Sequence, residues 1–146
     1  LSENRKDNFA AGLSMGGYGA FKLGLRYPER YAAVGSLSGA LDIVNRIPES
    51  DTALYTEMRN IFGDEEILER DGGNLLSLVN AVEEPEKYPR FYQACGTEDF
   101  LYMDNQNFLS AADAAGLDIT YEESRGDHNW IFWDEYIQKF LNFIGK

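Results

Sequence analysis

A glycine-rich turn between a short apolar segment and a helical pattern is the feature that most restricts how this chain folds. Residues 8–12, NFAAG, are small and apolar, and they run directly into the sequence LSMGGYGA. This pattern is typical of a buried strand that enters a tight turn. From Gly16 the apolar residues follow helical spacing until Pro28, which stops the helix. The segment therefore predicts a strand, a sharp turn and a helix that packs on the strand.

The rest of the chain continues the alternation of strands and helices. The apolar spacing and the glycine and proline positions predict a strand at 31–38, a strand at 90–95, a helix at 104–115, a strand at 118–123 and a helix at 129–144. Strands that alternate with helices form a mainly parallel sheet with helices on both faces. The expected fold class is therefore α/β with about four strands. Strand 118–123 alternates polar and apolar residues, which favours a position near an edge of the sheet.

Two segments differ from this regular pattern. Residues 42–87 are polar and acidic, carry helical patches at 53–62 and 65–70, and are broken at 71–74; we interpret them as a cap-like insert within a single domain, 1–146. The helix at 129–144 instead has a wide apolar face, which predicts that it packs on the sheet. That face is formed by Trp130, Trp133, Ile137, Phe140, Leu141 and Ile144.

Composition excludes several classes of function. The chain has 146 residues, with 13 Lys plus Arg against 25 Asp plus Glu, a net charge of −12. This charge disfavours nucleic acid and anionic membranes as partners. No apolar run approaches the roughly 20 residues that span a bilayer. A single cysteine, Cys95, excludes an internal disulfide and a thiolate zinc site, and one histidine with scattered carboxylates predicts no metal site. The single cysteine also favours a cytoplasmic location.

The turn itself matches the pattern G-x-S-x-G at Gly12, Ser14 and Gly16. A serine on a sharp strand-to-helix turn projects out of the sheet in a strained conformation, where it can act as a nucleophile. We expect that a Cβ at Gly12 or Gly16 would clash with neighbouring chain, and that the small residues Gly17, Gly19 and Ala20 let the helix pack closely. The backbone N–H of Met15, at the helix N-terminus, is the candidate donor to a developing oxyanion. Outside this context, Ser14 would be read as an ordinary turn serine.

A nucleophilic serine requires a base and an acid. In folds of this type the chain order is serine, acid, histidine, and the only histidine, His128, lies in the predicted loop between the strand 118–123 and the last helix. Asp99 follows the strand 90–95 and is the candidate acid, with Glu98 and Asp104 as rivals. Asp127 directly precedes His128, which disfavours a bond from its side chain to the ring.

Other interpretations of these residues stay open. Asp99 also fits a turn former or a cap for the helix at 104–115. Cys95 is interpreted as a small buried hydrophobic residue and not as a second nucleophile. Trp130, Trp133 and Phe140 are interpreted as core, although Trp130 also lies close enough to His128 to border a substrate pocket.

Three blocks of sequence resemble a known family. Residues 12–42, 95–102 (CGTEDFLY) and 126–130 (GDHNW) are similar to the esterase D group of α/β-hydrolases, and especially to bacterial tributyrin-esterase-type carboxylesterases. The resemblance implies a triad of Ser14, Asp99 and His128 that hydrolyses short-chain carboxylic esters through an acyl-enzyme, without a cofactor. The group also contains S-formylglutathione hydrolases, feruloyl and acetylxylan esterases and acyltransferases, which remain alternatives.

The resemblance covers only the C-terminal half of the family fold. That fold has eight strands, and the four predicted here correspond to the last four. The loop that supplies the second oxyanion N–H would then lie before residue 1. The edge of strand 8–12 would pair either with the N-terminal half of the same protein or with a second copy. An inactive fragment that acts only by association is the alternative to an enzyme.

Overall fold

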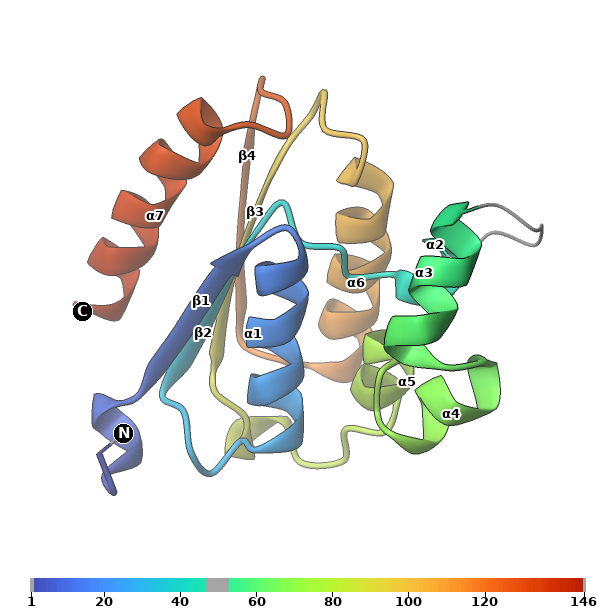
Figure 1. The fold of residues 1–146 in the computed structure, drawn as a ribbon. Helices are drawn as coiled ribbons and strands as arrows, with labels where there is room; N and C mark the ends of the chain where they lie inside the picture. Colours follow the sequence, from blue (N-terminus) through green and yellow to red (C-terminus); the bar gives the residue numbers. More distant parts are fainter. Residues whose placement is uncertain (1, 47–52, 146) are drawn as a thin grey trace.

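The computed structural model describes residues 2–46 and 53–145, which contain a four-stranded parallel sheet (Figure 1). The strands are β1 (Phe9–Leu13), β2 (Ala33–Leu37), β3 (Arg90–Gly96) and β4 (Ile119–Ser124). Their spatial order is β1-β2-β3-β4, so that β1 and β4 are the two edges. The predicted α/β class and all four predicted strands are confirmed. The short 3₁₀ helix η1 (Arg5–Asp7) precedes β1.

Helices cover both faces of the sheet, as predicted. The helices α1 (Met15–Arg26) and α6 (Tyr102–Ala115) lie on one face, and α7 (Trp130–Ile144) lies on the other (Figure 1). Successive residues of a strand point to opposite faces. Phe91 of β3 therefore joins Phe21 and Phe108 in the core under α1 and α6, whereas Tyr92 packs with Phe140 beneath α7. Each face thus has its own aromatic core.

The segment 42–87 forms a group of short helices beside α1 and α6 (Figure 1). Their bounds are α2 (Ile43–Arg46), α3 (Ala53–Phe62), α4 (Glu65–Arg70), α5 (Leu75–Asn80) and the 3₁₀ helix η2 (Pro85–Lys87). The helical patches expected at 53–62 and 65–70 are confirmed, whereas α5 was not predicted. Leu68, Leu75 and Val79 are almost fully buried in the core beneath α1 and α6, so α4 and α5 pack at the side of the sheet.

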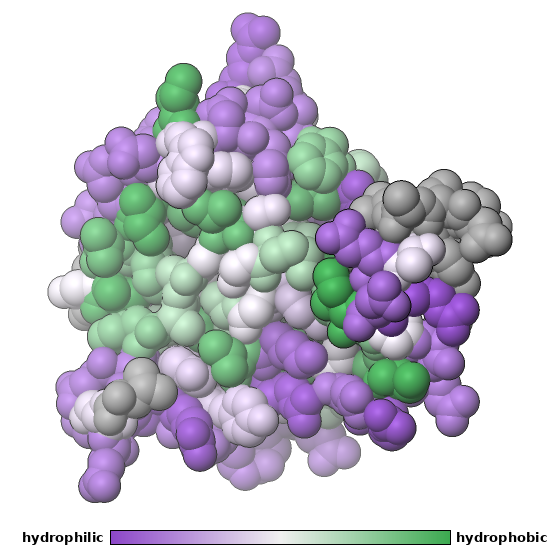
Figure 2. Space-filling view, in the orientation of Figure 1, coloured by the Kyte–Doolittle hydropathy of each residue, from purple (hydrophilic) through white to green (hydrophobic). Residues whose placement is uncertain are grey.

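The edge of β1 and the neighbouring part of α7 form an apolar surface. Figure 2 shows hydrophobic side chains gathered over β1 and α7. A groove of about 320 Å³ runs between the two elements, lined by Ala11, Gly12, Leu13, Leu37, Trp130, Trp133, Asp134 and Ile137.

Part of the helix face predicted as core is exposed. Trp133 and Phe140 are buried, but Trp130 is 72% exposed and Leu141 55% exposed. The prediction of core positions for Trp130 and Leu141 was therefore wrong. The reason is that the described chain places no element over this part of α7. In the described ranges, no helix is long and apolar enough to span a bilayer.

Candidate active site

Ser14 lies on a strained turn between β1 and α1. Its φ of 54° and ψ of −122° fall outside the helical and extended regions, and it directly precedes the first helical residue, Met15. The turn is held by hydrogen bonds from the Ser14 N–H to the Leu37 carbonyl (2.9 Å) and from the Tyr18 N–H to the Ser14 carbonyl (3.2 Å). The first N–H groups of a helix have no acceptor within that helix, so the N–H of Met15 belongs to a set of available donors.

The glycines of this turn have different structural roles. A Cβ at Gly12 would lie 2.3 Å from the backbone of Gly16, and one at Gly17 would lie 2.5 Å from the Ser36 hydroxyl oxygen. The predicted clash is thus confirmed at Gly12, and the predicted close packing of a small residue is confirmed at Gly17. At Gly16 a Cβ would meet no described atom within 4 Å beyond the neighbouring backbone of its own helix, so the predicted clash was wrong there. The same open space at Gly19 means that the close packing predicted at that position was also wrong. A Cβ at Gly12 would overlap the backbone of Gly16, whereas a Cβ at Gly16 itself would point into open space.

The loop between β4 and α7 brings His128 to Ser14. The imidazole Nε2 lies 3.0 Å from the Ser14 hydroxyl oxygen. On the other side of the ring, Nδ1 lies 2.9 Å and 3.1 Å from the two carboxylate oxygens of Asp99. The Asp99 side chain is fully buried, and the His128 side chain is 17% exposed. These contacts form a continuous chain from carboxylate through imidazole to hydroxyl, at the C-terminal ends of the strands.

Asp99 is positioned by the loop that follows β3. Its carboxylate accepts a hydrogen bond from the Leu101 N–H (2.8 Å). The Glu98 N–H donates to the Gly126 carbonyl (2.9 Å), which ties this loop to the loop that carries His128. A Cβ at Gly96 would lie 2.3 Å from the Gly126 carbonyl oxygen. The close approach of the two loops therefore depends on glycine at position 96.

The rival acids contact other groups. Glu98 pairs with Arg125 at the surface (3.0 Å), and Asp104 pairs with Arg46 (2.8 Å). Asp127 accepts a hydrogen bond from the backbone N–H of His128 (2.7 Å) and not from its ring. Among the four acids considered from the sequence, Asp99 is the one in contact with the imidazole.

Two aromatic rings contact the imidazole. The ring of Trp133 meets His128 edge-to-face at 4.9 Å, and the ring of Phe100 lies 4.7 Å away. Trp133 is buried, whereas Phe100 is 63% exposed. Trp130 packs on Trp133 at 5.3 Å and lines the groove beside β1. Sequence reasoning missed Phe100, although it directly follows the candidate acid.

Cys95 precedes the candidate acid Asp99 by four residues, but its thiol is not available as a nucleophile. The side chain is fully buried at the end of β3, and this burial raises the pKa of the Cys95 thiol to about 12. A thiol with such a pKa stays protonated near neutral pH and is a poor nucleophile. The interpretation of Cys95 as a small buried hydrophobic residue is confirmed.

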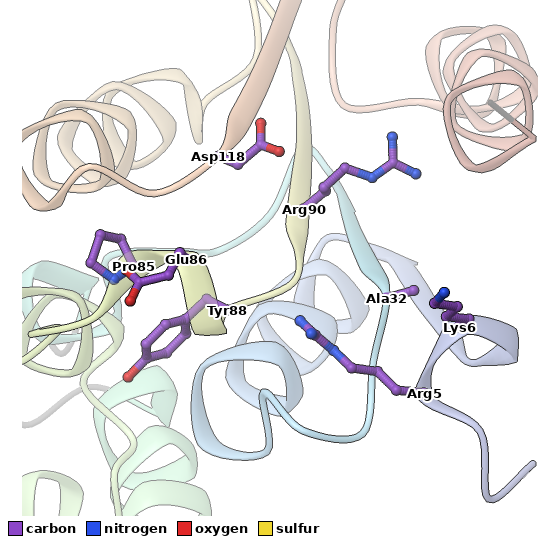
Figure 3. Close-up of a pocket in the computed structure, with 8 residues that line it drawn as sticks. All are labelled: Arg5, Lys6, Ala32, Pro85, Glu86, Tyr88, Arg90 and Asp118. Atoms are coloured by element: carbon purple, nitrogen blue, oxygen red, sulfur yellow. The ribbon is translucent and has the colours of Figure 1, made fainter.

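A second cavity, of about 470 Å³, lies at the opposite end of the sheet (Figure 3). Ala32, Arg90 and Asp118, which line it, stand at the N-terminal ends of their strands. The Arg5 guanidinium reaches into this region but donates to the carbonyls of Tyr31 and Lys87. Arg90 points away, towards α7, where it lies over the Phe143 ring. The charged groups therefore do not converge on one ligand position. Across the described residues, no cluster of side chains has the composition of a metal site.

Comparison with known proteins places the chain among esterases. Over its full length it is 35% identical to the acetyl esterase of Caldicellulosiruptor saccharolyticus. Its structure superposes on the fluorophosphonate-binding serine hydrolase FphF of Staphylococcus aureus with a TM-score of 0.80 and 30% identity. The S-formylglutathione hydrolase FrmB of the same organism gives 0.79 and 29%. All three comparisons cover the whole of this chain but 57% of the relative. Residues 1–144 match the Esterase family, described as "Putative esterase", and the chain belongs to that family.

Proposed function

We propose that this chain carries the catalytic triad of a serine hydrolase that cleaves short-chain carboxylic esters. The observation that supports this proposal is the contact chain Asp99–His128–Ser14, in which both imidazole nitrogens have a partner within 3.1 Å. A hydroxyl on a strained turn, next to an imidazole that a buried carboxylate orients, is the arrangement that activates serine for acyl transfer.

The reaction proceeds in two steps. Neutral His128 takes the proton of the Ser14 hydroxyl as Ser14 attacks the ester carbonyl, and Asp99 stabilises the resulting imidazolium. His128 then protonates the leaving alcohol, which leaves an acyl group on Ser14. Water, deprotonated by His128, attacks this acyl group and releases the carboxylic acid. Because the imidazole must be neutral to accept the proton, kcat/KM falls as the solution is made acidic.

The oxyanion is held by the N–H of Met15 together with a second donor outside this chain. Removal of one such donor lowers the rate by about 10²–10³ in serine hydrolases. We therefore expect the chain to be much less active alone than together with the segment that supplies the second donor.

The surface beside the site is suited to such a segment. The outer edge of β1 has free hydrogen-bonding groups, and the apolar groove next to it borders Ser14 through Leu13. The indole N–H of Trp133, which lines this groove, is buried and has no hydrogen-bond partner among the described residues. We infer that the occupant is the remaining part of the same protein, since the relatives are longer than this chain. Association of two copies through the β1 edge is the alternative.

Co-expression tests this inference. We expect the chain to form a stable 1:1 complex with the preceding part of its own gene product, and its esterase activity to rise by about 10² or more. Size-exclusion chromatography with light scattering measures the stoichiometry. A homodimer with full activity would instead support self-association, and an inactive complex would support a role in binding alone.

The substrate class proposed is a small acyl ester. The acetyl esterase and the S-formylglutathione hydrolase among the relatives act, by their names, on acyl groups of one or two carbons. Rates on p-nitrophenyl esters of increasing acyl length test this proposal. Trp130, which packs on Trp133 next to the imidazole of His128, is the proposed substrate contact, so that Trp130→Ala raises KM with little change in kcat. Product analysis with an added alcohol separates hydrolysis from acyl transfer.

The direct test of the proposal is hydrolysis of p-nitrophenyl acetate by the wild type and by Ser14→Ala, in the longest form that the gene encodes. We expect wild-type turnover and no turnover above background in the variant. Turnover retained by Ser14→Ala would overturn the proposal. We also propose a cytoplasmic location, which the free, buried Cys95 supports and cell fractionation tests.

A further inference from the structure

Arg46, at the end of α2 in the insert, reaches the loop that carries the candidate acid. Its guanidinium makes two parallel bonds to the Asp104 carboxylate, from Nε at 2.8 Å and from Nη2 at 2.9 Å. The same Nη2 donates to the Phe100 carbonyl oxygen at 2.6 Å. Phe100 directly follows Asp99, so Arg46 holds the backbone next to the candidate acid. The Asp104 side chain is 8% exposed and the Arg46 side chain 33% exposed, so the pair is largely shielded from solvent.

The same guanidinium also lies over the Phe100 ring. Its central carbon lies 5.4 Å from the Phe100 ring centroid, and the Phe100 ring lies 4.7 Å from the imidazole of His128, tilted by 53°. Arg46, Phe100 and His128 thus form a row of contacts that begins in the insert and ends at the candidate base. Phe100 is 63% exposed and is not held in place by burial. The Arg46 guanidinium holds Phe100 instead, because it lies over the ring and donates a hydrogen bond to the Phe100 carbonyl oxygen.

The imidazole therefore contacts one ring that the core fixes and one that it does not. Trp133 is buried against β1 and β2. Phe100 is exposed, and its contact partner in the insert is Arg46. Catalysis by a base requires its nitrogen to stay within hydrogen-bond reach of the hydroxyl, and a displacement of about 1 Å lowers rates by up to about 10².

We propose that Arg46 is a positioning residue that keeps His128 between Asp99 and Ser14 by holding Phe100 and the loop 97–101. This inference deepens the proposed function and rests on it. It assigns the start of the insert a role in catalysis, because Arg46 joins α2 to the loop that carries the candidate acid.

A purely structural role for Arg46 makes a different prediction. In that case the Arg46–Asp104 pair would only fasten the insert to α6, as the Asn107–Asp42 bond does. Asn107 of α6 donates to the Asp42 carboxylate at 2.8 Å, next to the start of α2, and neither residue has a described contact with Phe100 or His128. Asn107→Ala is therefore the matched control, because it removes a bond between the insert and α6 and leaves the contacts among Arg46, Phe100 and His128 in place.

The test compares three variants. Arg46→Lys keeps the charge that Asp104 requires, but a single ammonium group cannot reproduce the planar fork that reaches both Asp104 and the Phe100 carbonyl. Arg46→Met combined with Asp104→Asn removes both charges, so that no buried charge is left without a partner. We expect both to lower kcat about tenfold or more with KM changed less than about threefold. Asn107→Ala should keep kcat within about twofold of the wild type. Circular dichroism and thermal melting verify that each variant folds.

A second measurement does not depend on activity. His128 is the only histidine in the chain, so its imidazole signals in an NMR spectrum are unambiguous, and a His128→Asn spectrum assigns them in a longer form of the protein. We expect a slowly exchanging Nδ1 proton in the wild type and in Asn107→Ala, and exchange at least about tenfold faster in both Arg46 variants. Unchanged exchange and kcat in the Arg46 variants would overturn the inference while leaving the proposed function intact. An inactive wild type would overturn the proposed function, and the exchange rates would still decide whether Arg46 orders the imidazole.

Discussion

Ser14 and His128 are 114 positions apart in the sequence, yet the Ser14 hydroxyl lies 3.0 Å from the imidazole Nε2. The parallel sheet explains this contact. Ser14, Asp99 and His128 follow the C-terminal ends of β1, β3 and β4, and parallel strands direct all these ends to one rim. The register of the sheet, together with glycine at position 96, then sets the distance between the loops.

Replacement of Asp99 by Asn should abolish most activity while keeping the fold. Asparagine can still accept the Leu101 N–H bond, but its amide would donate to Nδ1 and place the ring proton on Nε2, which faces Ser14. An imidazole in that tautomer cannot accept the serine proton. We expect kcat to fall by about 10⁴, as for the equivalent change in serine proteases.

Glu98→Gln is the control for this prediction. Glu98 is adjacent to Asp99, but its carboxylate pairs with Arg125 at the surface. We expect the variant to retain kcat within about twofold, because exposed ion pairs contribute little. If steady-state kinetics show Glu98→Gln to be as impaired as Asp99→Asn, the assignment of the acid is wrong.

The glycines of the turn should respond oppositely to alanine. At Gly12 a Cβ would overlap the Gly16 backbone, so Gly12→Ala should lower the free energy of unfolding by about 3 kcal/mol. At Gly16 a Cβ would meet no described atom within 4 Å, and alanine favours the helix by up to about 1 kcal/mol. Urea unfolding measures both. Equal destabilisation by the two substitutions would contradict the geometry of the turn.

Stability should fall as the pH rises above 9. Burial raises the pKa of the Cys95 thiol from 9.0 to about 12, so its contribution to stability is complete below pH 9 and is lost as the pH rises towards 12. We expect the free energy of unfolding to fall by about 1 kcal/mol between pH 9 and 10, because the unfolded thiol is only half ionised at pH 9. Above pH 10 the fall should be steeper, because burial also raises the pKa of Tyr18 to about 12.

Cys95→Ala isolates the contribution of the thiol. The variant has no titrating group at this position, so urea unfolding should show a loss of stability between pH 9 and 10 that is smaller by about 1 kcal/mol. If the free energy of unfolding of Cys95→Ala falls with pH as steeply as that of the wild type, burial does not raise the pKa of the thiol. Iodoacetamide at pH 8 should label Cys95 only after unfolding.

Much of the fold could be predicted because it depends on local patterns. The strand at 90–95 and the helices at 53–62 and 65–70 have apolar periods, prolines or glycines that mark their limits. The order serine, acid, histidine and the position of one histidine were enough to select Ser14, Asp99 and His128 as the side chains that meet. Their catalytic role stays a prediction that the kinetic experiments test.

The features that could not be predicted depend on contacts between distant segments. Gly16 and Trp130 were misjudged because the space around a residue is set by elements far away in the sequence. No local signal links Arg46 to Phe100, since the two residues meet only after the insert packs against α6. Helix α5, with the sequence LLSLVN, is a short run of mostly apolar residues, and periodicity alone does not distinguish a helix from a strand in such a run.

The most direct measurement is covalent labelling by a fluorophosphonate, followed by mass spectrometry of the modified peptide. The probe reacts with a serine only when a neighbouring base activates it. Labelling should occur at Ser14 alone, should be lost in Ser14→Ala, and should be strongly reduced in a His128→Asn variant. A label on another serine, or equal labelling of Ser14 after His128 is replaced, would contradict the account.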